Sequence, residues 1–182
     1  MAKLVKVTYG DALFELAVEE NKVDVLFEQA QAVLESFRNN QDLIRFLNHP
    51  KIETIEKEKA IENIYKGFVT KDMVGFLTLI VSKQRHNDIP DILEYFIGKV
   101  KEYKKIGVVY VTSSVELTAT QKEKIVDKLQ KTTDYLSFEM NYAVDKSLIG
   151  GLVIRIGDRV VDSSIRTKIE ELTRDLQKIQ LQ

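Results

Sequence analysis

The 182-residue sequence contains no cysteine, and this absence excludes a disulfide framework, a thiolate nucleophile and a cysteine-ligated metal site. It has only two histidines, His49 and His86, and neither has the close histidine or cysteine neighbour that compact metal motifs require. We expect His49 to lie in a loop near a helix end and His86 to be solvated. The sequence therefore predicts no metal site and no other cofactor.

Long apolar runs are also missing. Nowhere do about 18 consecutive apolar residues occur, so the sequence predicts no membrane-spanning helix. The N-terminal segment carries Asp11 and Glu15 and has no long apolar core, which fits neither a signal peptide nor a transit peptide. The lack of cysteine suits a reducing compartment. We expect a cytoplasmic protein whose association with any membrane is indirect.

The chain also lacks an excess of charge of either sign. Its 27 basic and 28 acidic residues nearly cancel, so it has no strong positive field of the kind that drives binding to phosphate backbones. We expect no nucleic-acid partner. Hydrophobic residues nevertheless make up 44% of the chain, which is enough for one large domain or two small ones to bury a core.

In the first half of the chain, apolar residues recur at steps of three and four, the spacing of amphipathic helices. One of these stripes stops before Pro50, because a proline disfavours helical geometry in the residue that precedes it. About six stripes occur, and they lie within residues 5–17, 23–37, 43–47, 55–68, 74–81 and 89–100.

Past Gly107 the apolar period changes to about 2, which is typical of strands. Residues 108–111 and 136–144 are predicted strands, and the helix between them begins at a capping box formed by Thr118 and Gln121. A hairpin turn at Gly157-Asp158 and a final helix follow. The predicted strands of this hairpin are 152–156 and 159–161.

The predicted fold class is α+β, with a six-helix bundle over residues 1–105 followed by a small βαββα domain over 106–182. The last helix carries a narrow apolar seam suited to packing on a sheet or on another helix. Its first members are Ile165, Ile169 and Leu172.

The glycines of the second half match neither the dinucleotide-binding nor the phosphate-loop motif. We expect Gly150 and Gly151 to permit a bulge or a close backbone approach at a strand start, and Gly157 to serve the hairpin turn. Asp158, Asp162 and Arg166 form a polar cluster beside this turn, and we interpret Asp162 as a cap for the last helix. No catalytic residue is predicted, and we expect the chain not to be an enzyme.

The segment Ile149–Arg166, IGGLVIRIGDRVVDSSIR, resembles the C-terminal signature of the delta subunit of bacterial F-type ATP synthases, whose mitochondrial relative is the oligomycin sensitivity-conferring protein. The segments 9–14, 46–50 and 84–90 are also similar to that family, and the resemblance covers essentially the whole chain. Gly10 departs from the family's usual alanine, which implies either a weaker helix or a close neighbour there. The signature residues matched are Gly150, Gly151, Gly157, Asp158 and Asp162.

The resemblance implies a non-catalytic stator subunit that links the catalytic alpha/beta head to the peripheral stalk. Residues 1–105 would bind the N-terminal helices of alpha subunits, and residues 106–182 the C-terminal region of stalk subunit b. It also implies peripheral attachment at the cytoplasmic face of the bacterial plasma membrane, through the complex alone. The alternative is a small RNA-binding module with a helical adaptor domain.

By the same resemblance, the alpha-binding groove involves the first and fifth helices. Ordinary bundle core is an equally good interpretation of these apolar residues, because any buried helix carries such a stripe. The groove candidates are Tyr9, Ala12, Leu13, Leu77 and Ile80. The stalk-binding candidates are Ile165, Ile169 and Leu172.

Overall fold

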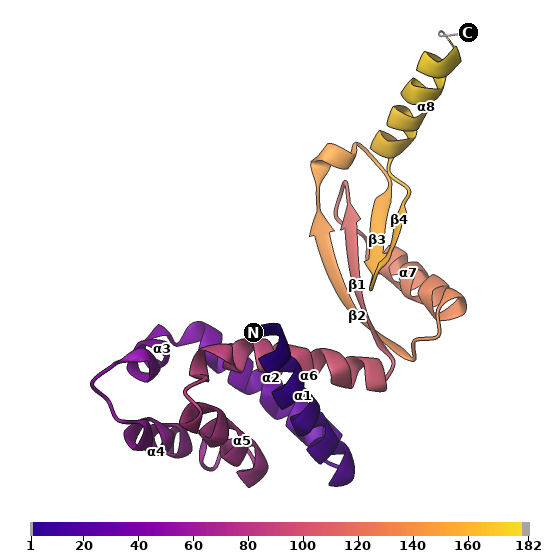
Figure 1. Ribbon diagram of the computed structural model, residues 1–182. Coiled ribbons are helices and arrows are strands. Elements are labelled where there is room, and N and C mark those ends of the chain that lie inside the picture. The colour runs from indigo at the N-terminus through magenta and orange to yellow at the C-terminus, as the bar shows by residue number, and fades with distance from the viewer. Residues whose placement is uncertain (1, 180–182) are drawn as a thin grey trace. The chain divides into compact units, whose positions relative to one another are not determined.

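The computed structural model describes residues 2–179, with side-chain burial described for residues 4–174. The chain divides into two compact units, Met1–Val100 and Lys101–Gln182, whereas the boundary predicted from the sequence lies between residues 105 and 106. The first, which we call the helical unit, contains helices only. The second, the sheet unit, combines helices with a four-stranded sheet (Figure 1). This mixture of helix and sheet confirms the α+β class.

The helices of the helical unit begin and end at residues that suit those positions. The side chain of Asn40 accepts a hydrogen bond from the Leu43 amide at 3.1 Å, and that of Thr70 accepts one from the Met73 amide at 3.4 Å. Pro90 lies in a first turn, where no helical amide is needed. The helices are α1 (Ala2–Glu19), α2 (Val23–Asn39), α3 (Gln41–Asn48), α4 (Thr54–Tyr65), α5 (Lys71–Ser82) and α6 (Ile89–Tyr103).

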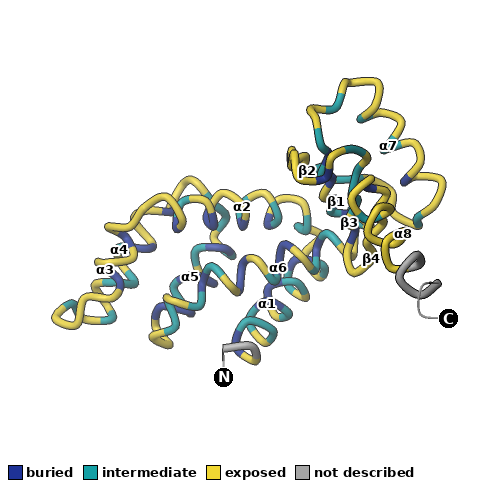
Figure 2. The backbone as a smooth tube through the Cα atoms, turned by 90° about the horizontal axis from the view of Figure 1, so that it is seen from above, coloured by how far each residue is buried: buried dark blue, intermediate teal, exposed yellow. Residues whose placement is uncertain are grey.

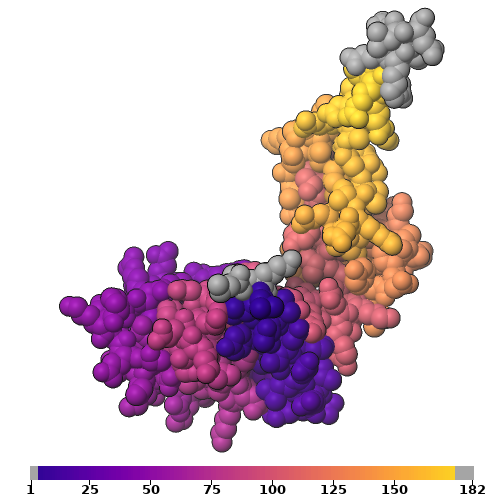
Figure 3. Space-filling view, in the orientation of Figure 1, coloured from indigo at the N-terminus to yellow at the C-terminus, as the bar shows by residue number. Residues whose placement is uncertain are grey.

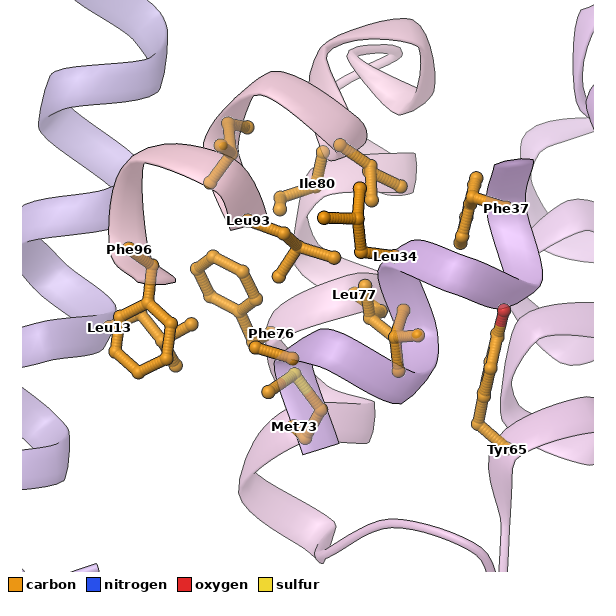
Figure 4. Close-up of a cluster of buried hydrophobic side chains, with 14 of the residues drawn as sticks. Leu13, Leu34, Phe37, Tyr65, Met73, Phe76, Leu77, Ile80, Leu93 and Phe96 are labelled. Carbon is orange, nitrogen blue, oxygen red and sulfur yellow. The ribbon is translucent and has the colours of Figure 1, made fainter. Parts of the chain in front are cut away.

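The core of the helical unit receives buried side chains from all six of these helices (Figure 2). Leu13, Phe76 and Phe96 gather on one side of the cluster shown in Figure 4, and Phe37 and Tyr65 on the other. The rings of Phe37 and Tyr65 are stacked, with centroids 6.4 Å apart. Because burial of one such side chain contributes about 1.5–3 kcal/mol, this core is a major source of the unit's stability.

Gly10 lies where helix α6 approaches α1 closely. A Cβ atom at Gly10 would collide with the Tyr95 ring, so the glycine admits a neighbour, and the close-approach interpretation is the correct one. The Tyr95 hydroxyl donates to Asp11 Oδ1 at 3.0 Å, and Lys99 pairs with the same carboxylate. The hydrogen bond from Lys99 lowers the pKa of Asp11.

The sheet unit has strand order β2-β1-β3-β4, in which β1 pairs parallel with β2 and antiparallel with β3. Parallel neighbours need a crossover, and α7 supplies it. The elements are β1 (Ile106–Ser113), α7 (Ala119–Thr132), β2 (Ser137–Val144), β3 (Leu152–Ile156), β4 (Arg159–Asp162) and α8 (Ile165–Ile179), with the short 3-10 helix η2 (Lys146–Leu148) before β3. The predicted βαββα order is wrong by one strand. The four individual strands predicted from the sequence are all present, and with both hairpin strands counted the described order is βαβββα.

Helix α7 packs on one face of this sheet. Its start has the predicted capping box of Thr118 and Gln121. The buried cluster beneath it consists of Val109 and Val111 from β1, Leu129 from α7 and Ile156 from β3, with Phe138 and Met140 of β2 partly buried against it. Alternation along the strands places these residues on the same face.

Candidate interaction surfaces

The five predicted alpha-binding residues do not share one environment. Leu13, Leu77 and Ile80 belong to the buried core, and none has more than 1% of its surface exposed. Tyr9 is half-buried and Ala12 is exposed. The structure therefore leaves only Tyr9 and Ala12 of this set accessible to a partner, while the other three support the surface from beneath.

A groove of about 1020 Å³ lies between α4 and α5 of the helical unit. Val74, Gly75 and Leu79 of α5 form its apolar wall, and Leu79 is 48% exposed. The sequence-based prediction missed Leu79 because its side chain lies off the stripe that packs into the core. A large apolar residue outside a helix's buried stripe is the signal that could have identified it.

The stalk-binding candidates on α8 share one exposed strip. Ile165 is 44% exposed, Ile169 49% and Leu172 63%, on a helix that is otherwise polar over its described side chains. In Figure 3 the yellow atoms at the start of α8 lie at one end of the sheet unit. An amphipathic helix whose apolar strip is open to solvent is a typical contact surface for another protein.

The glycine pair of the signature lies where α8 meets the sheet. Gly151 has φ +80°, and a Cβ there would collide with the backbone of Ser163. A Cβ at Gly150 would lie 2.5 Å from Ile165 Cδ1, and the Ile165 amide donates to the Gly150 carbonyl at 3.0 Å. The expected close backbone approach is present, and it holds the start of α8 against the loop before β3.

Ile149, beside this pair, is held in a strained conformation. It has φ +64°, rare for a β-branched residue, and the Gly150 amide closes a tight turn onto the Leu148 carbonyl at 2.6 Å. The Ile149 side chain is 67% exposed.

The cap of α8 differs from the prediction. Ser164, not Asp162, is the capping residue, because its hydroxyl accepts the Thr167 amide at 3.2 Å. Asp162, two residues earlier, stabilises this cap. Its carboxylate accepts hydrogen bonds from the Ser164 amide at 2.8 Å and from the Thr167 hydroxyl at 2.7 Å. The Thr167 hydrogen bond, followed by the bond from the Ser164 amide, lowers the pKa of Asp162.

Gly157 and Asp158 form the turn between β3 and β4, as predicted. Gly157 has φ +55°, and Asp158 is not among the described residues with positive φ, which is the combination of a type II′ turn. Both residues serve backbone geometry at this position.

His86 is only partly solvated, in contrast to the expectation of a solvated side chain. It is half-buried, its Nδ1 atom is buried without a described hydrogen-bond partner, and its Nε2 atom lies 3.2 Å from Asn48 Oδ1. Burial, together with repulsion from Lys57, lowers the pKa of the imidazole. Within the described residues no cluster of histidine, aspartate or glutamate could hold a metal ion.

The exposed apolar surfaces of both units define this chain as an interaction protein. The family profile described as "ATP synthase delta (OSCP) subunit" matches residues 5–176. A relative named ATP synthase subunit delta, from Lachnoclostridium phytofermentans, is 55% identical over 181 residues and covers 100% of both chains. Its counterpart from Oceanobacillus iheyensis is 31% identical, with 92% of each chain covered. A chain in the structure of the Toxoplasma gondii mitochondrial ATP synthase hexamer has the same fold, with a TM-score of 0.72 at 19% identity, covering 94% of this chain and 97% of that one.

The chain therefore belongs to the ATP synthase delta (OSCP) subunit family. It is a non-catalytic stator component of an F-type ATP synthase. No helix within residues 2–179 combines the length and the apolar character needed to cross a membrane.

Proposed function

We propose that this chain links the catalytic head to the peripheral stalk, with the helical unit binding the N-terminal helices of alpha subunits and the sheet unit binding the C-terminal region of stalk subunit b. The observation that carries the proposal is the exposed strip of Ile165, Ile169 and Leu172 on α8. Covering apolar surface contributes about 25 cal/mol per Å², so this strip favours a protein partner. The site of action is the cytoplasmic face of the bacterial plasma membrane, with attachment through the complex.

A stator must resist torque, so its contacts need a large area and slow dissociation. Amphipathic helices laid against apolar grooves meet this requirement. For the alpha helices we propose contacts at Tyr9 and Ala12 on α1 and, in the separate groove between α4 and α5, at Leu79, with Leu13, Leu77 and Ile80 in the core beneath these helices. The near-neutral charge does not favour the alternative of an RNA-binding module.

The test is affinity purification of the tagged full chain from its native membranes in mild detergent, with the co-purifying chains identified by mass spectrometry. Wild-type protein should recover the alpha and beta subunits together with subunit b. Ile169→Asp/Leu172→Asp should lose subunit b and keep alpha, whereas Ala12→Glu should lose alpha and keep subunit b. Arg174→Asp, on the opposite side of α8 from the strip, is the matched control and should keep both. Recovery of neither alpha nor b by the wild type would contradict the proposal.

A further inference from the structure

The sheet is wider than the single helix that covers it. A helix is about 10 Å across and strands lie about 4.8 Å apart, so one helix covers about two strands. Helix α7 packs over Val109 and Val111 of β1, over Phe138 and Met140 of β2 and over Ile156 at the end of β3. The same face of β3 and β4 is therefore only partly covered.

An apolar groove of about 420 Å³ occupies this uncovered part. Its floor consists of Leu152, Ile154 and Val161, which the strand register places on the α7 side of the sheet, and Val161 is 59% exposed. Ile125 and Leu129 of α7 form its wall. The groove thus offers an apolar surface on which a second helix can pack beside α7.

The rim of the groove carries charge of one sign. Lys124 and Lys128 lie one helical turn apart on α7, and Arg159 lies across from them at the start of β4. None of the described residues that line the groove is acidic. A segment that fills the groove would place its edges beside three cations, which favours carboxylates at those edges.

Helix α8 of the same chain is directed elsewhere. Its first turn is held by the bond between Ile165 and Gly150 and by the bonds that Asp162 accepts from Ser164 and Thr167. Figure 1 shows α8 running out beyond the end of the sheet. Folding α8 back over the groove would break these bonds.

We propose that the groove between α7 and the β3–β4 hairpin binds an amphipathic helix whose apolar face is edged with carboxylates, supplied by the stalk partner. This inference rests on the proposed stator function and adds to it a second contact surface, separate from the α8 strip. The cations orient the helix, and Leu152, Ile154 and Val161 bury its apolar face.

The first test measures binding of the full chain to detergent-solubilised ATP synthase prepared without this subunit. Lys124→Glu/Lys128→Glu should bind at least about tenfold more weakly than wild type, because two cations that attract the carboxylates of the bound helix become anions that repel them. Lys51→Glu/Lys59→Glu makes the same change of charge on the exposed surface of the helical unit and should bind like wild type. Equal binding by both double variants would overturn the groove proposal while leaving the stator function intact. Failure of the wild type itself to bind would instead contradict the stator function.

A second test uses two designed helical peptides with the same apolar face, one edged with glutamate and one with lysine. Wild-type protein should prefer the glutamate-edged peptide, and Lys124→Glu/Lys128→Glu should prefer the lysine-edged one. Such a reversal would also show that the variant remains folded. Equal binding of the two peptides to the wild type would overturn the proposal.

Discussion

The two units of this molecule differ in how completely they bury their own apolar surface. In the helical unit, α1 to α6 all contribute to one buried core. In the sheet unit, the described cluster buries only Val109, Val111, Leu129 and Ile156, while the described apolar side chains of α8 and part of one sheet face remain open. The comparison indicates that the helical unit buries most of its apolar surface within itself, whereas the sheet unit leaves apolar surface exposed that the proposed stalk partner would cover.

The largest expected effect separates core from surface within one helix. Leu77→Ala should lower the free energy of unfolding of the helical unit by about 3 kcal/mol, because Leu77 is fully buried. Leu79→Ala, two residues away and 48% exposed, should change it by less than about 0.5 kcal/mol and weaken alpha binding instead. Urea unfolding followed by circular dichroism measures both. Equal losses of stability would show that the core is not confined to the described cluster.

The next effect tests the junction of the sheet unit. Gly151→Ala should destabilise that unit by about 2 kcal/mol, because alanine at φ +80° is strained and its Cβ collides with the Ser163 backbone. Gly98→Ala is the control. Gly98 lies within α6 with open space around its Cβ position, so alanine there should stabilise the helical unit by about 0.5–1 kcal/mol. Thermal unfolding of the two variants should shift in opposite directions, and a harmless Gly151→Ala would refute the close approach.

A smaller effect concerns the cap of α8. Ser164→Ala should cost the sheet unit about 1 kcal/mol, because the Thr167 amide loses its acceptor. Ser163→Ala removes an exposed hydroxyl and should be nearly neutral. Hydrogen exchange in the first turn of α8 reports the difference directly. Unchanged protection in Ser164→Ala would assign the cap to Asp162 after all.

The smallest effect is a pH dependence confined to the helical unit. The pKa of His86 is lowered in the folded chain, so the unfolded chain takes up the proton first as the pH falls. The stability that the neutral imidazole contributes is fully present above the ordinary histidine pKa of 6.5. It is lost as the pH falls through the lower pKa that His86 has in the folded chain. His86→Gln should remove this part of the pH dependence in urea unfolding. An unchanged dependence in His86→Gln would assign it to other groups.

Prediction from the sequence succeeded where local spacing decides the structure and failed where neighbouring segments do. Steps of three and four revealed the helices, and Thr118 with Gln121 revealed a helix start, because both depend on residues within a turn of one another. Periodicity could not tell whether Leu77 lines a binding groove or belongs to the core. That distinction depends on which helix packs against each side.

The sequence by itself determined the α+β class, the change from helical to strand periodicity near Gly107, the turn at Gly157 and the family. Only the tertiary structure decided that Tyr95 packs on Gly10, that Ser164 caps α8, that His86 is half-buried, and that a groove with a cationic rim lies beside α7. The physical reason is the distance along the chain between the residues that interact. Backbone periodicity and turn chemistry are properties of adjacent residues, whereas burial and grooves arise from segments that are distant in the chain and meet only when it folds.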